Sequence, residues 1–242
     1  MKHLVDTSHT SVNQHLEAMN IRVAPDSLAT MLKHLDFVIE TNQSINLTAI
    51  TDPEEALRLH LIDSLTAMPE VIAAPPGPLV DLGTGGGFPG LELGLATGRV
   101  TVLVDSVRKK TEAIQRFLLQ ESLDSWISVS ALRAEELARQ RPGQFAVVTA
   151  RALSSLPALV ELAAPLLIKG GRLVAMKGRL DESELDRANR VADMVGMQLE
   201  LRRPLLLPQG QEMREVVSFE RTGKSRVRLP RREGLAQRRP LA

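Results

Sequence analysis

The residues best suited to chemistry in this chain form a glycine-rich segment at 79–90, which reads LVDLGTGGGFPG. An apolar run precedes the glycines, and a helix-like pattern follows them. Glycine allows sharp turns and lets a ligand lie directly against the main chain. A glycine-rich turn between a strand and a helix typically holds a nucleoside-containing cofactor at the edge of an open α/β sheet. The alternative is a tight structural turn without a ligand.

Two registers of these glycines favour different cofactors. Counted from the end of the apolar run, residues 81–87 give D-x-G-x-G-x-G, whereas residues 85–90 give the dinucleotide pattern G-x-G-x-x-G. We favour the first register, because Gly83 directly follows the apolar run and Pro89 fits the first turn of a helix. The carboxylate of Asp81 would repel a pyrophosphate, but it suits a ligand with an amino group and no phosphate, such as S-adenosylmethionine.

Two further carboxylates are placed to hold a nucleoside. Asp105 ends the apolar run VTVLVD, 18 residues after Gly87, where an acid can accept hydrogen bonds from both hydroxyls of a ribose. The alternative is a cap at the end of a strand. Glu135 follows the third predicted strand and could orient the adenine, or it could be an acid in the first turn of a helix. Both residues support a nucleoside cofactor without choosing which one.

Nucleophilic and metal-based catalysis find little support in the sequence. The chain has no cysteine, which excludes disulfides, thiolate zinc sites, iron–sulfur clusters and a cysteine nucleophile. All five histidines precede the glycine-rich segment, and His3, His9 and His15 are too dispersed to indicate a metal site. His60 and Asp63 lie one helical turn apart and could face the ligand, although a pair on a helix surface is the more common explanation.

The elements that must position these residues follow from the apolar patterns. From residue 79 onward, strand-like and helix-like patterns alternate, which implies right-handed crossovers and a mainly parallel sheet. We expect a helical extension over 1–74, an α/β core over 79–221 and a tail over 222–242, with the breaker APPGP between the first two. The predicted strands are 79–83, 100–105, 126–132, 145–151, 171–178, 197–207 and 214–221, and the predicted helices begin near 89 and 134 or span 107–121, 156–168 and 181–195.

Two helices are predicted within the extension. Residues 27–43 space their apolar side chains at the helical interval, and Ser27 or Asp26 is the expected N-cap. A second helix should start at Asp52, with Pro53 in its first turn and two glutamates facing the positive end of the helix dipole.

Basic residues gather toward the end of the chain. Residues 221–242 carry eight Lys or Arg and one acid, a net charge of +7, whereas the other 220 residues carry 22 basic and 28 acidic groups, a net charge of −6. Arginine forks bind phosphate oxygens well, so the segment predicts contact with RNA or DNA, with a solvated tail as the alternative. Proline and glycine there argue against a long helix. We expect removal of residues 221–242 to weaken RNA binding and to spare cofactor binding.

Composition argues against several other classes of protein. Aromatic residues make up 2% of the chain, too few for a protein that stacks successive bases on rings. No stretch approaches the ~20 apolar residues that cross a bilayer, and the N-terminus lacks the apolar region of a signal peptide. These features predict a cytoplasmic protein that binds no membrane and no metal, and we expect a monomer.

Six motifs occur together in a fixed order: NLTAI, D-x-E-E-x-x-x-x-H-x-x-D-S, VDLGTGGGFPG, VDSVRKK, TARALSSL and AMKG. As an ordered set they resemble the ribosomal RNA small-subunit methyltransferase G family, also called glucose-inhibited division protein B, from about residue 28 to the basic tail. The resemblance implies the class I methyltransferase fold, which is Rossmann-like, with a mostly parallel seven-stranded sheet whose last strand is antiparallel. It also implies methyl transfer from S-adenosylmethionine to N7 of one guanine in 16S rRNA.

The resemblance assigns roles to particular residues of this chain. The implied cofactor contacts are Gly83, Phe88, Ala134, Glu135 and Arg151, to which the glycine register and the strand end add Gly85, Gly87 and Asp105. Two positions depart from the family. Phe88 stands where many members have leucine, and Leu229 replaces an aromatic residue of the tail.

Methyl transfer to guanine N7 needs no general base, because N7 has a free lone pair at neutral pH. Catalysis would rest on the alignment of N7 with the methyl carbon and the sulfur. Asp63 is our candidate for stabilising the positive charge that develops on the base. Arg151 lies where cofactor and target could meet, or else closes the sheet with an ion pair. The phosphates of the expected partner, 16S rRNA or the small ribosomal subunit, could be bound by Lys109, Lys110, Lys177, Arg231 and Arg232.

Two other functions stay open at this point. An NAD(P)-dependent oxidoreductase would use the later glycine register, but the chain has no tyrosine and therefore no catalytic Tyr-Lys pair. A non-catalytic RNA-binding assembly factor could keep the same fold, although the glycine loop and Asp105 are both intact.

Overall fold

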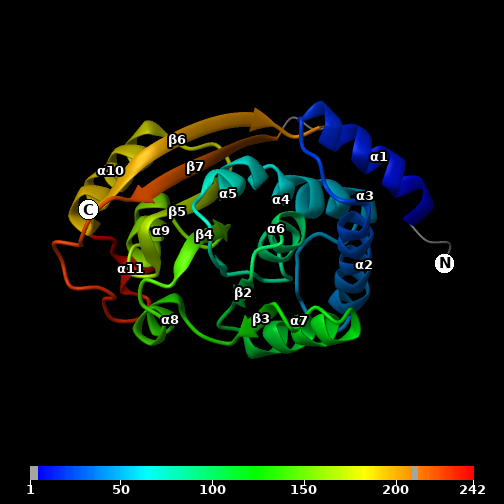
Figure 1. Cartoon of the computed structure of the whole chain (residues 1–242), viewed down its shortest axis with the longest axis horizontal. Helices are drawn as coiled ribbons and strands as arrows, with labels where there is room; N and C mark the ends of the chain where they lie inside the picture. Colours follow the sequence, from blue (N-terminus) through cyan, green and yellow to red (C-terminus); the bar gives the residue numbers. More distant parts are fainter. Residues whose placement is uncertain (1–4, 209–211) are drawn as a thin grey trace.

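A computed structural model describes residues 5–208 and 212–242 of the chain. Its centre is a seven-stranded sheet with the order β3-β2-β1-β4-β5-β7-β6 (Figure 1). The strands are β1 (Leu79–Leu82), β2 (Thr101–Val104), β3 (Ile127–Ser130), β4 (Phe145–Arg151), β5 (Leu167–Lys177), β6 (Met197–Leu206) and β7 (Met213–Arg221). The pairs from β3 to β5 are parallel, and β7 runs antiparallel to both of its neighbours. This confirms the sheet that the resemblance predicts.

Helices cover both faces of the sheet (Figure 1). They are α1 (Val5–Ala18), α2 (Pro25–Asn42), α3 (Pro53–Ala56), α4 (Asp63–Leu65), α5 (Met68–Ala73), α6 (Gly90–Thr97), α7 (Arg108–Gln120), α8 (Ala134–Gln140), α9 (Leu156–Ala163), α10 (Glu182–Val195) and α11 (Leu235–Arg238). Side chains alternate along each strand, so Val80 and Leu82 pack against α8, α9 and α10 while Leu79 packs against α6 and α7. Each face of the sheet therefore has its own apolar core.

The N-terminal extension packs on the face that carries α6 and α7, where α1, α2 and α5 share the same apolar core. α2 begins at Pro25 with Ala24 as its N-cap and no side-chain cap, so the cap predicted at Ser27 or Asp26 is wrong. The hydroxyl of Ser27 instead donates to the carbonyl oxygen of Leu95, at 3.0 Å, and ties α2 to α6. A tertiary contact has here replaced a local cap.

The second predicted helix starts as expected and then departs from regular geometry. The carboxylate of Asp52 accepts a hydrogen bond from the N–H of Glu55 at 2.9 Å, which confirms the cap. After α3 the chain forms a π-helical turn, η1 (Leu57–Ile62), before α4. A π-helical turn holds more residues than an α-helical turn and is frequent at functional sites. The helical interval therefore did not predict how His60 and Asp63 are placed.

Two boundaries near the middle of the chain differ from the predicted ones. α9 ends at Ala163, and β5 begins at Leu167, where it pairs with Phe145. The helix predicted through residue 168 is therefore too long, because a short apolar run suits a buried strand as well as a helix. In the tail, all of which is described, the helical part is the four-residue α11, as proline and glycine predict. The division into extension, core and tail stays a prediction.

Candidate active site

The glycine-rich loop joins β1 to α6 and contains three glycines with positive φ: Gly83 (+71°), Gly85 (+58°) and Gly87 (+107°). Close packing also excludes a side chain at two of them. A Cβ atom at Gly83 would lie 2.7 Å from the side chain of Leu153, and one at Gly87 would lie 2.8 Å from the ring of His34. The loop therefore needs glycine both for its conformation and for its contacts.

Asp81 is not accessible to a ligand, which corrects our interpretation of its carboxylate. The side chain is fully buried: Oδ2 accepts a hydrogen bond from the N–H of Gly90 at 3.1 Å, and Oδ1 accepts one from the hydroxyl of Thr149 at 2.7 Å. Burial raises the pKa of Asp81 to about 7, although these hydrogen bonds act in the opposite direction. The carboxylate fixes the start of α6, which begins at Gly90 as the first register predicts.

Folding stability should fall with rising pH because of this buried group. Unfolded Asp81 loses its proton near pH 3.8, whereas folded Asp81 keeps it up to about pH 7. This stabilisation is fully present below about pH 4 and is lost as the pH rises to about 7. The free energy of unfolding therefore falls by roughly 2–3 kcal/mol between pH 5 and 8. We expect the free energy of unfolding in urea to fall by this amount relative to that of the Asp81→Asn variant. Equal pH dependence in the two proteins would contradict the assignment.

A cleft beside the glycine loop lies at the carboxyl ends of β1 and β2. It brings together four of the predicted cofactor-binding residues, Gly83, Asp105, Ala134 and Glu135. The rest of its lining is Leu82, Val104, Ser106, Leu132, Arg133, Leu153, Leu162 and Gln237. Carboxylates can accept hydrogen bonds from hydroxyl and amino groups, and leucine side chains can pack on a flat ring. This set of acceptors and apolar side chains suits an adenosine, the larger part of S-adenosylmethionine, and the hollow is called the cofactor cleft below, after this prediction.

Both carboxylates of this cleft also bind main-chain groups. Asp105 accepts hydrogen bonds from the N–H groups of Gly85 (3.0 Å) and Val107 (2.8 Å), so it caps the end of β2 and holds the glycine loop. Glu135 lies in the first turn of α8 and accepts a hydrogen bond from the N–H of Gly234 at 2.7 Å. Asp105 therefore caps the end of a strand and Glu135 is an acid in the first turn of a helix, which are the two structural alternatives given for them above. Carboxylate oxygens have further lone pairs, so a nucleoside can bind in addition.

The basic tail forms part of the cofactor cleft, which the sequence did not indicate. Gln237 of α11 lines the cleft, and Ala236 is buried in the core near α9. Arg231 anchors the segment, because its guanidinium donates to both carboxylate oxygens of the buried Glu161 at 2.6 Å. The geometry therefore does not support our expectation that residues 221–242 can be removed without harm to cofactor binding.

A second pocket is lined by Ile50, Leu59, His60, Asp63, Arg151, Ala152, Met176, Lys177, Gly178 and Arg214. Asp63 is almost fully buried in its wall. Oδ2 of Asp63 accepts a hydrogen bond from Nη1 of Arg151 at 2.8 Å, and Oδ1 accepts one from Nε of Arg214 at 3.2 Å. The structure thus brings together the two residues predicted to act in catalysis. Sequence reasoning missed Arg214, because 151 positions separate it from Asp63.

His60 is neutral at physiological pH, since burial, and then the charge of Arg151, lower its pKa to about 4. Its Nδ1 accepts a hydrogen bond from Arg151 at 3.3 Å, because an arginine can only donate. Nε2 therefore carries the proton and donates to the hydroxyl of Thr48 at 2.7 Å. The ring also stacks on Phe88, with centroids 4.6 Å apart. The interpretation of His60 and Asp63 as a helix-surface pair is wrong, because both are buried.

The two hollows are separated by the residues that follow β4. Ala152 lines the second pocket, and its neighbour Leu153 lines the cofactor cleft. Ala152 has a φ of +55°, a conformation that residues other than glycine seldom adopt. Such backbone strain concentrates at ligand sites.

Four residues predicted to bind the cofactor are not in the lining of the cleft. One of them is Gly85, whose N–H is bound to the carboxylate of Asp105. Arg151 lies in the second pocket, Phe88 is buried against His60, and Gly87 packs against His34. Phe88 and Gly87 support the shape of the loop instead. Direct contact of these four with the cofactor stays a prediction.

The predicted RNA-binding residues differ in how free their charges are. Lys109 is exposed in the first turn of α7, and Lys110 is half-buried beside it. Lys177 lines the second pocket, but its ammonium group lies 3.0 Å from a carboxylate oxygen of Glu184. Arg231 is committed to its buried ion pair. These contacts favour Lys109 over Lys177 and Arg231 as a free contact for phosphate.

Within 5–208 and 212–242, no group of three His, Asp or Glu side chains could hold a metal ion. No helix in those ranges is long and apolar enough to cross a membrane.

Solved structures with a similar fold include methyltransferases. A geranyl diphosphate methyltransferase in complex with S-adenosylmethionine superimposes with a TM-score of 0.56 at 14% identity, over 70% of this chain and 88% of that chain. The antibiotic-resistance methyltransferase Kmr superimposes with a TM-score of 0.51 at 17% identity, over 65% of this chain and 92% of that chain. These likenesses establish the class I methyltransferase fold.

Sequence comparison decides the family. The family model for rRNA small subunit methyltransferase G matches residues 27–205. The chain belongs to this family. The ribosomal RNA small subunit methyltransferase G of Cupriavidus pinatubonensis is 37% identical over 220 residues, which cover 85% of this chain and 91% of that protein. The corresponding protein of Desulfitobacterium hafniense is 33% identical over 228 residues, which cover 93% and 94%. As a member of the methyltransferase G family, the chain is a methyltransferase whose cofactor is S-adenosylmethionine.

Proposed function

We propose that this member of the methyltransferase G family transfers a methyl group from S-adenosylmethionine to N7 of one guanine in 16S rRNA, as a monomer in the cytoplasm. The observation that carries the proposal is the pair of hollows on either side of Ala152 and Leu153. One has a lining that suits adenosine, and the other holds Asp63 between two arginines. Two adjacent hollows suit a reaction in which a group passes from one ligand to another.

Guanine N7 can react without the help of a base. When bound, S-adenosylmethionine supplies an activated methyl group on a positively charged sulfur. The N7 lone pair forms the new bond to carbon as the carbon–sulfur bond breaks, and the positive charge moves onto the base. No proton has to be removed by the protein, which agrees with a pocket whose histidine, His60, is neutral and hydrogen-bonded at both ring nitrogens.

The residues of the second pocket can orient the base and balance its charge. Guanine presents O6 beside N7 as a second acceptor. Arg151 and Arg214 each have N–H groups beyond those that bind Asp63, and donation to O6 would fix the base while N7 stays free. The carboxylate of Asp63 offsets one of the two guanidinium charges, so that positive charge on the methylated base is opposed less than it would be without Asp63.

The oxidoreductase alternative is disfavoured by the position of Gly90. In the later glycine register this residue would help to bind a pyrophosphate. In the structure it is the first residue of α6, and its N–H is bound to the buried carboxylate of Asp81. The N–H of Gly90 is therefore not available to bind a pyrophosphate, and the carboxylate of Asp81 lies behind it.

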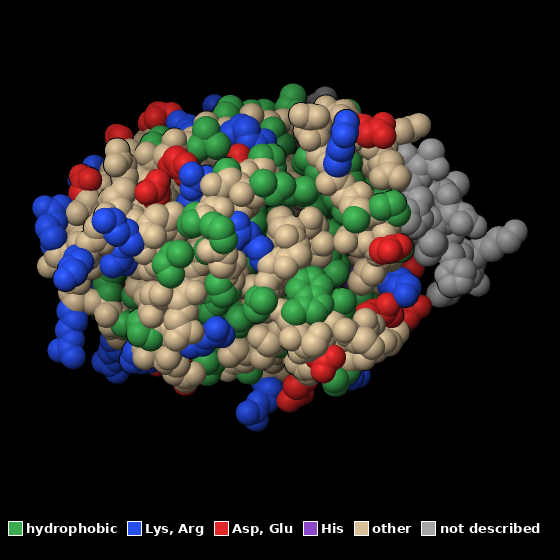
Figure 2. Space-filling model, viewed as in Figure 1, with side chains coloured by type: hydrophobic (Ala, Val, Ile, Leu, Met, Phe, Trp, Pro, Cys, Tyr) green, Lys and Arg blue, Asp and Glu red, His purple; other side chains and the backbone are tan. Residues whose placement is uncertain are grey.

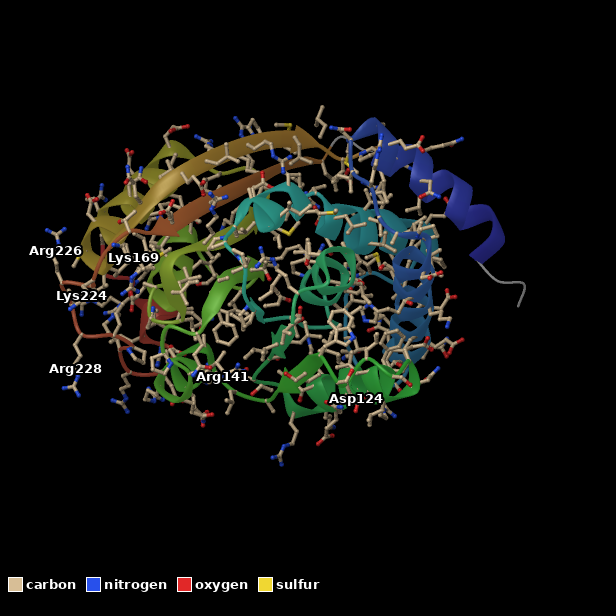
Figure 3. The ribbon with its side chains drawn as sticks, viewed as in Figure 1. Asp124, Arg141, Lys169, Lys224, Arg226 and Arg228 are labelled. Atoms are coloured by element: carbon tan, nitrogen blue, oxygen red, sulfur yellow. The ribbon has the colours of Figure 1, made fainter. Side chains whose placement is uncertain are left out.

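The distribution of charge favours a large polyanion as the substrate. Figure 2 shows lysine and arginine side chains gathered at the end of the molecule that carries the tail. Lys224, Arg226 and Arg228 project outward from this end, and Lys169 lies near them (Figure 3). A basic surface attracts RNA through its phosphates and speeds its association.

Methyl transfer from labelled S-adenosylmethionine to 30S subunits and to free 16S rRNA tests the proposal. The modified base is mapped by strand cleavage selective for N7-methylguanine. We expect label at one guanine, and the preferred substrate identifies the assembly stage. A protein that binds S-adenosylhomocysteine and RNA but transfers no methyl group would instead be the non-catalytic assembly factor.

A further inference from the structure

A third hollow lies next to the cofactor cleft and is rich in arginine. Its lining combines Arg133 and Arg139 of the α8 region with Arg232 and Arg238 of the tail, and these four side chains are called the arginine cluster below. Glu233, Gly234 and Gln237 complete the lining. Segments about 100 positions apart in the sequence thus direct four cations to one place.

The charge of the arginine cluster is only partly balanced. Four arginines and Glu233 give this hollow a net charge of +3. Arg139 forms an ion pair with Glu233 at 2.5 Å, and Arg238 donates to the carbonyl oxygen of Gly234 at 3.2 Å. Among the residues that the structure describes, the guanidinium groups of Arg133 and Arg232 have no hydrogen-bond or ion-pair partner. The hollow can therefore accept an anion.

Of the five other arginines in residues 221–242, three are engaged in the fold. Arg231 is held by the buried Glu161, and Arg226 donates to the carbonyl oxygen of Asp193. Arg221 donates to the carbonyl oxygen of Ala164. Their donors are satisfied by the protein itself, whereas those of the arginine cluster open to solvent.

The arginine cluster is continuous with the cofactor cleft. Arg133 and Gln237 line both hollows, and the N–H of Gly234 in the cluster binds Glu135 in the cleft at 2.7 Å. S-adenosylmethionine carries no phosphate, so the cofactor itself offers no anion to these arginines. The anion must come from another ligand that reaches this edge of the cleft.

We propose that the arginine cluster binds a backbone phosphate of the rRNA substrate at the edge of the cofactor cleft, an inference that rests on the proposed function. Guanidinium forks match the paired oxygens of a phosphate, and exposed arginines can meet a backbone that lies on the surface. Phosphate contacts fix the register and orientation of a nucleic acid without reading its sequence. The cluster thus positions the RNA while the second pocket receives the base.

The test compares two double variants that remove the same charge from different parts of the tail. Arg232→Gln with Arg238→Gln empties half of the cluster, and neither residue lines the cofactor cleft. The control, Lys224→Gln with Arg228→Gln, removes two cations that project outward (Figure 3). The dissociation constant for free 16S rRNA is measured from 50 to 200 mM salt, and binding of S-adenosylhomocysteine is measured by calorimetry.

We expect the cluster variant to bind 16S rRNA about tenfold more weakly and to lower the slope of log K against log salt by about 0.7–0.9, as one lost phosphate contact requires. The control should show a smaller loss of RNA affinity and a smaller change in the salt slope. Both variants should bind S-adenosylhomocysteine like the wild type. A cluster variant that matches the control in RNA binding, or that loses S-adenosylhomocysteine binding, overturns the proposal.

The two proposals fail in different ways. If the wild type binds 16S rRNA through the arginine cluster but methylates no guanine N7, the proposed function fails while the phosphate site stands. If the wild type methylates one guanine and the cluster variant behaves like the control, only the phosphate site fails.

Discussion

Replacing Asp63 by asparagine should lower kcat for methyl transfer at least 100-fold and leave binding of S-adenosylhomocysteine within about twofold. Asp63 is almost fully buried and holds Arg151 and Arg214 through separate oxygens. Asparagine keeps the shape but presents an NH2 group to one arginine and leaves two guanidinium charges unbalanced. Removing one partner of a buried ion pair typically costs about 3–5 kcal/mol, and a 100-fold loss of rate corresponds to about 2.7 kcal/mol.

A second buried carboxylate provides the matched control for this variant. Glu70 is also nearly inaccessible and binds Arg203 with both oxygens, at 2.7 and 2.8 Å, but it lines neither hollow. The Glu70→Gln variant should lose stability like Asp63→Asn and keep its kcat within a few-fold. Methyl transfer and urea unfolding are measured on both proteins. Equal kcat in the two variants would show that Asp63 has a structural role alone.

Replacing Gly87 by alanine should lower the free energy of unfolding by about 2–5 kcal/mol and weaken binding of S-adenosylhomocysteine more than tenfold. The residue has a φ of +107°, and an added Cβ would lie 2.8 Å from the ring of His34. That ring cannot move aside easily, because its nitrogens are bound to Glu92 at 2.8 Å and to the carbonyl oxygen of Gly86 at 2.9 Å. The strain should therefore displace the loop.

A variant of Gly98 separates the effect of a positive φ from that of the contact between an added Cβ and the ring of His34. Gly98 ends α6 with a φ of +67°, and a Cβ added there would have no atom within 4 Å. The Gly98→Ala variant should lose only about 1 kcal/mol and bind S-adenosylhomocysteine like the wild type. Urea unfolding measures the loss of stability of each variant, and calorimetry measures its binding of S-adenosylhomocysteine. A Gly87→Ala variant that behaves like Gly98→Ala would mean that His34 does not hold the loop.

The parts of the molecule that could be predicted are those set by local chemistry. The cap at Asp52 and the start of α6 after Pro89 depend on neighbours within a few residues. The strands that directly precede Gly83 and Asp105 depend on continuous apolar runs, which a buried parallel sheet requires. Their register then brought both residues to one edge of the sheet, as expected of parallel strands.

The parts that could not be predicted depend on contacts between distant segments. The burial of Asp81 follows from the approach of Gly90, whose added Cβ would lie 2.4 Å from the Asp81 side chain. The place of Arg214 beside Asp63 depends on where the antiparallel strand β7 begins. The link from Gly234 to Glu135 depends on the path of the tail, which carries no periodic pattern to indicate it. A sequence shows which charges exist, and only the fold shows which ones are already bound.

The tail's hydrogen bond to Glu135 has a consequence for the order in which the protein is made. A ribosome synthesises a chain from its N-terminus, so the strands and helices that carry Gly83, Asp105 and Glu135 exist long before Gly234 and Gln237 do. The growing chain can form much of the sheet without a finished cleft. Translation must pass residue 237 before the lining of the cleft is complete, so a product that stops before the tail lacks both Gln237 and the hydrogen bond from Gly234 to Glu135.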